Sequence, residues 1–122
     1  MIFYSDIKKM AKDNKAFRRV LETGKNLQLA FMSLKRSEDI GEEVHVSNDQ
    51  LYYIIDGKGE ATLDAKTEKF EKGDAFFVPA GVKHNLRNTT NEELKILTLY
   101  GPPLHAAGVV QTKKEELIAA KK

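Results

Sequence analysis

The sequence predicts an all-β fold, either a sandwich or a barrel, built from about eight short strands. Segments rich in β-branched and aromatic residues recur along the chain, and turn-forming residues separate them at intervals of about 8–12 residues. Little of the chain, mainly the N-terminal stretch, carries a helical pattern. The 122 residues suffice for one hydrophobic core and leave little room for a second. We therefore expect a single domain over residues 1–122.

A short helix is expected over residues 5–14, before the first strand. Ser5 is a suitable N-cap, and Ile7 and Met10 stand three residues apart, on one helical face. In the segment LQLAFMSL, apolar residues occupy both alternating positions, which is typical of a strand covered on both sides. Strands are expected at residues 17–21, 27–34, 43–46, 50–55, 60–63, 75–78, 84–88 and 94–100.

Glycine and proline mark the reversals between these strands. Asp56-Gly57 is a strong hairpin signal, because glycine accepts the positive φ of a tight turn. Pro79 and Gly81 suit the second and fourth positions of a turn, so that a new strand starts at residue 84. The run GPP at residues 101–103 ends the last expected strand, since proline cannot donate to a β-ladder.

The charge pattern argues against nucleic acid as the main partner. Twenty Lys and Arg stand against eighteen Asp and Glu, which gives a formal charge of +2, and the two signs are interleaved along the chain. Residues 113–122 alternate in sign and are expected to form a solvated helix or a frayed end. The chain has no cysteine, so a metal site would have to use nitrogen and oxygen ligands.

No segment of the sequence predicts membrane insertion or export. The N-terminus lacks a positively charged start followed by a long apolar run. No stretch approaches the ~18 apolar residues that a membrane span requires. We therefore expect a cytoplasmic protein without a membrane partner.

Four polar residues can carry the chemistry of this chain. Alternation along residues 43–46 places Glu43 and His45 on one strand face, while Gln50 and His84 each begin a further strand. If the sheets fold over one another, two imidazoles, a carboxylate and an amide oxygen converge. This set suits a divalent ion such as Mn, Fe, Co, Ni or Zn. The alternative, histidines that are exposed or satisfied within the core, stays open from the residues alone.

The sequence also resembles the cupin superfamily. The segment EEVHVSNDQLYYIIDGKG within residues 41–59 resembles the first cupin motif, with Gly57 as its closing glycine. The segment GDAFFVPAGVKHNLRN over residues 73–88 matches the second cupin motif at every defining position: Gly73, Pro79, Gly81, His84 and Asn88. The resemblance implies a jelly-roll barrel, also called a double-stranded β-helix, with a metal ion held inside it and a short helical segment before it.

The first motif departs from the usual family pattern at two positions, Glu43 and Gln50, whereas His45 matches the second histidine of the pattern. Glu43 and His45 stand where most cupins have two histidines, and Gln50 stands where most have glutamate. Cupins that linearise unsaturated uronates from pectin also place glutamine there. The ligands that the resemblance implies, for one divalent transition metal, are Glu43, His45, Gln50 and His84.

The resemblance narrows to small single-domain bacterial and archaeal cupins, described as mannose-6-phosphate-isomerase-like. The runs FRRVLETGKNLQLAFMSL, VPAGVKHNLRNT and YGPPLHAAGVV carry this likeness over most of the chain. Because many cupins are dimers, the resemblance also implies a homodimer.

Several other residues allow two interpretations. His105 follows the two prolines and is either a surface histidine or a proton donor and acceptor folded back to the barrel mouth. Tyr52, on the face of Gln50, either fills the barrel or offers its hydroxyl to the site. Three arginines are interpreted as solvated charges, and the alternative is that they bind an anionic substrate. These are Arg18, Arg19 and Arg87. Core positions are expected for Phe31, Met32, Phe76 and Phe77.

The leading functional hypothesis is a metal-dependent, isomerase-like enzyme acting on a small polar molecule, such as a sugar or sugar acid. The ion would polarise a carbonyl or hydroxyl group, and Tyr52 or His105 would move a proton. An iron-dependent dioxygenase is the alternative enzyme. The alternative of another class is a non-catalytic module that binds or senses a small ligand, because a fold does not settle a function.

Overall fold

The computed structural model describes residues 3–115, which form one helix and nine strands. Seven of the eight expected strand segments recur, and residues 43–46 are the exception. Two further strands are present, at Lys66–Glu71 and, after the run GPP, at Val110–Gln111, so that residues 94–100 are not the last strand of the described chain. The elements are α1 (Ile7–Asp13), β1 (Arg18–Thr23), β2 (Gln28–Leu34), β3 (Asp49–Asp56), β4 (Lys58–Leu63), β5 (Lys66–Glu71), β6 (Ala75–Val78), β7 (His84–Asn88), β8 (Leu94–Gly101) and β9 (Val110–Gln111).

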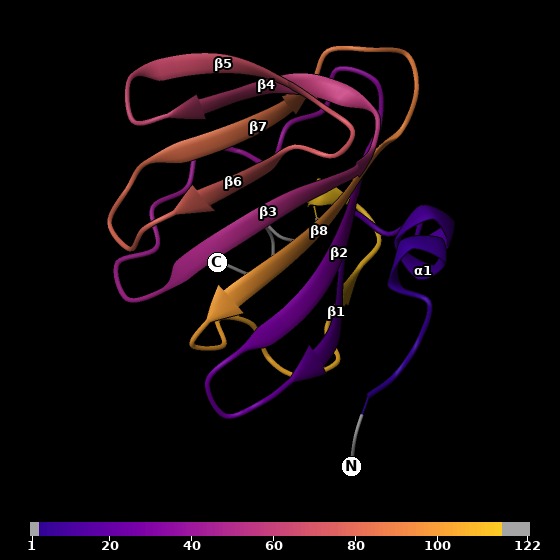
Figure 1. Ribbon diagram of the computed structural model, residues 1–122, viewed down its shortest axis with the longest axis vertical. Coiled ribbons are helices and arrows are strands. Elements are labelled where there is room, and N and C mark those ends of the chain that lie inside the picture. Colours follow the sequence, from indigo (N-terminus) through magenta and orange to yellow (C-terminus); the bar gives the residue numbers. More distant parts are fainter. Residues whose placement is uncertain (1–2, 116–122) are drawn as a thin grey trace.

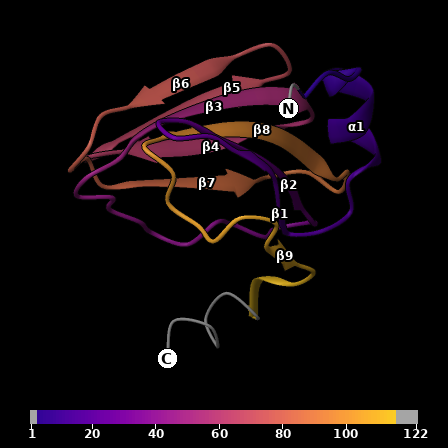
Figure 2. The same cartoon turned by 90° about the horizontal axis from the view of Figure 1, so that it is seen from below.

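Two antiparallel sheets form the barrel. The larger sheet has the strand order β6-β3-β8-β2-β1-β9, and the smaller has the order β5-β4-β7. Figures 1 and 2 show the larger sheet facing the smaller one, with the barrel interior between them. This arrangement confirms the expected all-β fold and is that of a jelly-roll barrel. No helix described over residues 3–115 is long and apolar enough to cross a membrane.

Helix α1 is present, but the expected N-cap is wrong. Asp6 caps the helix, and its carboxylate accepts a hydrogen bond from the Lys9 backbone N–H at 3.1 Å. Ser5 lies one residue too early for this contact, and its hydroxyl instead lies 2.7 Å from the Met10 sulfur. The apolar face of α1 packs on the outside of the larger sheet, where Ala11 joins Phe31 and Ile55.

Residues 43–46 do not form the expected strand. Glu43 makes a single antiparallel bridge with His84, and each backbone N–H donates to the other residue's carbonyl at 2.9 Å. No second ladder pair follows, because the next bond runs from the Gly81 N–H to the His45 carbonyl across the turn. The segment stays extended, so the expected alternation survives: Glu43 is buried, whereas Val46 is 81% exposed.

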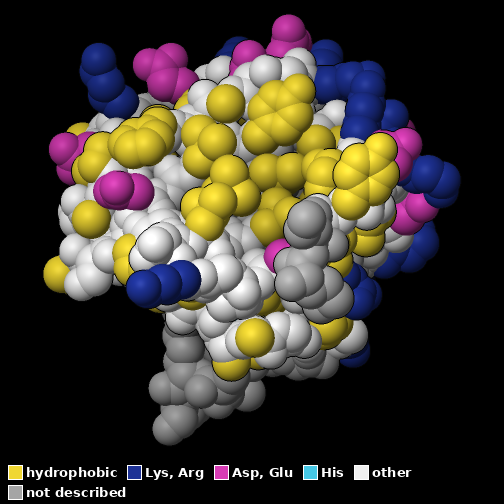
Figure 3. Space-filling model, turned by 60° about the horizontal axis from the view of Figure 1, so that its bottom comes forward, with side chains coloured by type: hydrophobic (Ala, Val, Ile, Leu, Met, Phe, Trp, Pro, Cys, Tyr) yellow, Lys and Arg dark blue, Asp and Glu magenta, His cyan; other side chains and the backbone are white. Residues whose placement is uncertain are grey.

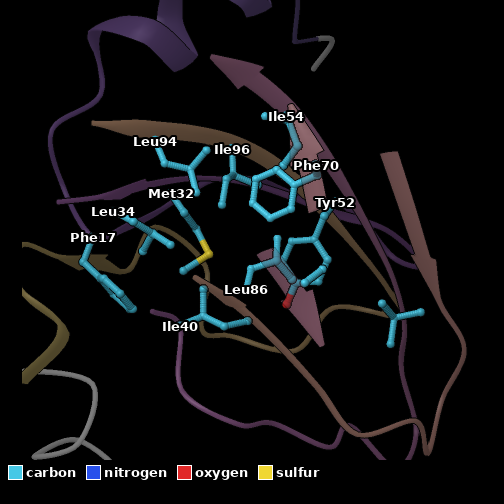
Figure 4. Packing of buried hydrophobic residues seen from close by; sticks show 12 residues of the cluster. Phe17, Met32, Leu34, Ile40, Tyr52, Ile54, Phe70, Leu86, Leu94 and Ile96 are labelled. Atoms are coloured by element: carbon cyan, nitrogen blue, oxygen red, sulfur yellow. The ribbon is translucent and has the colours of Figure 1, made fainter. Parts of the chain in front are cut away.

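The hydrophobic core fills the barrel between the two sheets (Figure 4). Met32 belongs to it, and Phe76 packs against it with its ring 5.5 Å from that of Phe70. Phe31 is also buried, but on the outer face under α1. The fully buried side chains of this cluster include Leu34, Ile40, Tyr52, Ile54, Leu86, Leu94 and Ile96.

Phe77 is not a core residue, contrary to the expectation. It alternates with Phe76 on β6 and therefore points to the outer face of the larger sheet, where it is 65% exposed. Tyr53 on the neighbouring strand shares this face and is 40% exposed. Figure 3 shows hydrophobic side chains gathered over this side of the molecule.

The C-terminal tail is described only in part. Lys114 forms an ion pair with Asp39, on the segment between β2 and β3. The remainder of the expected solvated tail, residues 116–122, lies outside the described residues.

Gly59 on β4 has no room for a side chain, which yields a test of the barrel packing. A Cβ atom there would lie 2.1 Å from the Arg87 carbonyl oxygen and 2.6 Å from the Phe70 ring. We expect Gly59→Ala to lower the free energy of unfolding by about 3 kcal/mol, measured by urea denaturation. Gly24→Ala is the control, because its nearest contact would be 3.3 Å and the expected loss is below about 1 kcal/mol. Equal losses in the two variants would contradict this packing.

Candidate metal centre

Three of the four predicted ligands come together inside the barrel. Glu43 and His45 lie on the extended segment before β3, and His84 begins β7. One possible ligand atom from each of these residues lies within 4.8 Å of the other two. The backbone bridge between Glu43 and His84 sets this approach, because it holds the two main chains in register.

His84 is held by hydrogen bonds at both ring nitrogens. Its Nδ1 lies 3.0 Å from the Val82 carbonyl oxygen, and its Nε2 lies 3.1 Å from the Tyr52 hydroxyl. Since a carbonyl can only accept, Nδ1 carries the proton in the neutral ring, and the Nε2 lone pair accepts the hydrogen bond of the Tyr52 hydroxyl. Burial lowers the pKa of His84, although the Val82 carbonyl and the Glu43 carboxylate act in the opposite direction. The ring is therefore kept neutral, as metal binding requires.

His45 is the third member of the group. Its Nε2 lies 3.7 Å from the Glu43 carboxylate, and its ring centroid is 5.3 Å from that of His84. The side chain is largely buried. Within the described residues, the buried Nε2 has no hydrogen-bond partner.

Gln50 lies inside the barrel at the start of β3 and is 1% exposed. Its amide nitrogen donates to the Thr98 hydroxyl at 2.9 Å, and that hydroxyl donates to the Leu51 carbonyl at 3.0 Å. The amide oxygen, in contrast, accepts no hydrogen bond from the described part of the chain. A buried amide oxygen that accepts no hydrogen bond from the described residues can serve as a ligand atom.

The donor set fits a transition metal. Two imidazole nitrogens and one carboxylate offer lone pairs to one point, and this combination suits the borderline divalent ions of the first transition row. The Glu43 carboxylate supplies one negative charge to balance the ion. The group can therefore hold a metal ion.

The two predicted proton-transfer residues lie at different distances from this group. Tyr52 is fully buried and contacts His84 directly through its hydroxyl. Burial raises the pKa of Tyr52 well above its usual value, so the hydroxyl stays protonated at neutral pH. Its ring centroid lies 5.7 Å from that of His84.

His105 folds back against the barrel from the loop after β8. Gln28 holds its backbone, accepting from the His105 N–H at 2.9 Å and donating to its carbonyl at 2.7 Å. Its ring packs edge-on against Tyr100, with the centroids 5.1 Å apart. His105 is thus half-buried, and Tyr100 separates it from His45, whose ring centroid is 6.1 Å from that of Tyr100.

Sequence reasoning gave too little weight to Arg18, whose favoured interpretation as a solvated charge is wrong. The residue is 0% exposed, and its guanidinium donates to the Gln111 side-chain oxygen at 3.0 Å. Arg19 is half-buried and donates to Asn14, whereas Arg87 is exposed, as expected. Strand alternation could have indicated the burial, because Arg18 shares a face of β1 with Val20.

The lowered pKa of His84 predicts how stability depends on pH. The unfolded chain takes up a proton at His84 near the ordinary pKa of 6.5, and the folded chain only at lower pH. We expect the free energy of unfolding of chelator-treated protein to decrease as the pH falls from 6.5 towards the folded-state pKa. Urea unfolding from pH 7.5 to 5 measures this slope, which should be shallower in His84→Gln. Identical slopes in the two proteins would contradict the burial of a neutral imidazole.

Comparison with known proteins agrees with the fold and the motifs. Uncharacterized protein YrkC of Bacillus subtilis is 38% identical over 124 residues, covering 97% of this chain and 67% of that protein. A crystal structure from Bacillus halodurans superposes with a TM-score of 0.94 at 37% identity, covering 96% of this chain and 93% of that one. An oxalate-binding protein of Thermotoga maritima is 30% identical over 70 residues, which covers 57% of this chain and 58% of that protein.

The family model that matches the chain is that of the cupin domain, over residues 30–100. This range contains both motif segments and all four predicted metal ligands. It also covers more than half of the chain, so the protein belongs to the cupin family.

Proposed function

We propose that this cupin is a metal-dependent enzyme that acts on a small polar molecule inside its barrel. The observation that carries the proposal is the buried group of Glu43, His45 and His84, whose ligand atoms lie within 4.8 Å of one another. Gln50 is the proposed fourth ligand, because its amide oxygen is buried without a donor from the described residues. The ion is one divalent transition metal: Mn, Fe, Co, Ni or Zn.

The residues around the centre support an isomerase-like reaction on a sugar, a sugar acid or a related carbonyl compound. A bound divalent ion would act as a Lewis acid towards a carbonyl or hydroxyl oxygen. Tyr52 keeps its proton at neutral pH and stands beside His84, so its hydroxyl can donate a hydrogen bond to such an oxygen. His105 stays the second proposed proton-transfer residue, at the barrel mouth behind Tyr100. The mannose-6-phosphate-isomerase-like subtype is part of this proposal.

Two alternatives each have an observation in their favour. Two histidines and one carboxylate form the ligand set of many non-haem iron oxygenases, which favours an iron-dependent dioxygenase as the second enzyme. The oxalate-binding protein of Thermotoga maritima favours a non-catalytic module that binds or senses a small ligand.

The remaining sequence predictions concern organisation. A single domain, a cytoplasmic location and the absence of nucleic-acid and membrane partners stay predictions. The homodimer is a proposal for which the outer face of the larger sheet offers a surface, since Phe77 and Tyr53 leave large apolar side chains in water there.

Metal analysis tests the centre directly. Protein purified without added metal should contain about one divalent ion per chain by mass spectrometry, and Glu43→Ala and His84→Ala should lose it. Glu42→Ala is the matched control, because Glu42 is an exposed neighbour that pairs with Lys83 outside the centre. Substoichiometric metal in the wild type, or unchanged metal in Glu43→Ala and His84→Ala, would overturn the metal centre.

Turnover assays then separate the functions. Uronates and ketoses test the isomerase, and catechol-like compounds with the iron-loaded protein test the dioxygenase. Conversion that is lost in His84→Ala supports an enzyme. Stoichiometric metal without any conversion would favour the binding module.

Analytical ultracentrifugation tests the homodimer. The wild type should sediment at about twice the chain mass of 13.8 kDa, and Phe77→Lys should sediment as a monomer, because a charge would be buried in the interface. Val46→Lys is the control, since Val46 is also an exposed apolar residue but lies outside the sheet. A monomeric wild type contradicts the proposal.

A further inference from the structure

A second set of polar groups lies inside the barrel and is not used by the metal centre. It consists of Arg18 on β1 and Tyr100 on β8, both of which are 0% exposed. Neither belongs to the motif segments at residues 41–59 and 73–88.

Strand register places both side chains on the inner face of the larger sheet. Arg18 is paired with Met32, which is paired with Ile96, and both partners belong to the core between the sheets. Tyr100 is paired with Gln50 across β3 and β8. Paired residues of neighbouring strands point to the same face, so Tyr100 lies beside the proposed fourth metal ligand.

The hydrogen bonds of Arg18 leave part of its guanidinium unused. One terminal nitrogen donates to Gln111 at 3.0 Å, and the other lies 3.9 Å from the Met32 sulfur, a weak acceptor. The Nε–H group is buried and has no acceptor within the described residues, and the same holds for the Tyr100 hydroxyl. Buried donors without acceptors cost folding free energy, so their occurrence together points to a ligand.

Arg18 and Tyr100 also affect each other electrostatically. Burial raises the pKa of the Tyr100 hydroxyl, and the positive charge of Arg18 partly offsets this effect. At neutral pH the tyrosine therefore keeps the proton that it can donate.

Four buried atoms that have no hydrogen-bond partner within residues 3–115 divide into two kinds. Gln50 Oε1 offers a lone pair, as does His45 Nε2 in the tautomer protonated at Nδ1, and lone pairs suit a cation. Arg18 Nε and Tyr100 Oη offer protons, which suit an anion. The two kinds adjoin, because Tyr100 is paired with Gln50 and its ring centroid lies 6.1 Å from that of His45.

We propose that Arg18 and Tyr100 form an anion subsite that binds the carboxylate of a short organic acid, whose other oxygens face the metal centre. This inference rests on the proposed function and extends it, because it names carboxylic acids as the class of substrate. Guanidinium is the preferred partner of a carboxylate in a buried site, since its geometry permits charge-assisted hydrogen bonds.

A purely structural role for Arg18 is the competing explanation. Its hydrogen bond to Gln111 links β9 to β1, and its guanidinium carbon lies 5.5 Å from the centre of the Phe17 ring. Such a role predicts that loss of the guanidinium lowers stability without changing the affinity for small acids.

Isothermal titration calorimetry with a matched pair of probes distinguishes these roles. Pyruvate carries a ketone beside a carboxylate, and hydroxyacetone has the same ketone beside an uncharged hydroxymethyl group. We expect the metal-loaded wild type to bind pyruvate at least 10-fold more tightly than hydroxyacetone. Arg18→Met should weaken pyruvate binding by about 10- to 100-fold, which is the change in affinity expected when one hydrogen bond to a charged group is lost. Binding of hydroxyacetone should stay unchanged.

Two further variants keep the test valid if Arg18→Met does not fold. Tyr100→Phe removes only the hydroxyl, and it should weaken pyruvate binding about 3- to 10-fold. Arg19→Met is the matched control, because Arg19 lies on the opposite face of the same strand and should leave the affinity for pyruvate unchanged.

The outcomes separate this inference from the proposed function. Metal content is measured in every sample, and the titrations are repeated after treatment with a chelator. Protein that lacks metal, but binds pyruvate in a way that depends on Arg18, would overturn the metal enzyme and support the anion subsite. Protein that holds metal, but binds pyruvate no better than hydroxyacetone, would overturn the subsite. Unchanged affinity in folded Arg18→Met or in Tyr100→Phe would also overturn it, as would an Arg18-dependent preference for inorganic phosphate.

Discussion

The site depends on one pair of backbone hydrogen bonds, between Glu43 and His84. Each residue's N–H donates to the other's carbonyl at 2.9 Å, although no strand ladder extends from this bridge. The bridge joins a segment that precedes β3 to the first residue of β7, which lies in the other sheet. Because the bridge fixes the main chain at both residues, it brings a carboxylate and an imidazole together before any side chain makes a contact.

Local signals in the sequence were sufficient for much of the fold. Gly57, Gly73 and Gly81 all have positive φ, so the turns were predictable from a requirement of the backbone itself. The last residue of the second motif, Asn88, has a similar architectural role, because its amide donates to the carbonyls of Leu34, Lys35 and Glu92. The spacing of this motif therefore reflects the geometry of the turns and the place of one buried amide, as well as the position of a metal ligand.

The errors arose where long-range packing decides the outcome. Phe77 is as hydrophobic as Phe76, and only the position of the second sheet determines which of the two faces the core. Arg18 is buried because β9 returns to pair with β1 and Gln111 accepts its hydrogen bond, across 93 residues of sequence. Residues 43–46 alternate like a strand, but a ladder also needs a partner, and β7 offers one at Glu43 alone.

The hydroxyl of Thr98 bears on the replacement of the family's glutamate by Gln50. A hydroxyl has one proton, and Thr98 donates it to the Leu51 carbonyl, so towards residue 50 it can only accept. An amide meets this demand with its NH₂ group, whereas an ionised carboxylate has no proton to give. Glutamine therefore satisfies this short hydrogen-bond chain as it stands, whereas an ionised glutamate would require Thr98 to turn its proton away from the Leu51 carbonyl. The direction of the chain also turns the amide oxygen, rather than the nitrogen, away from Thr98.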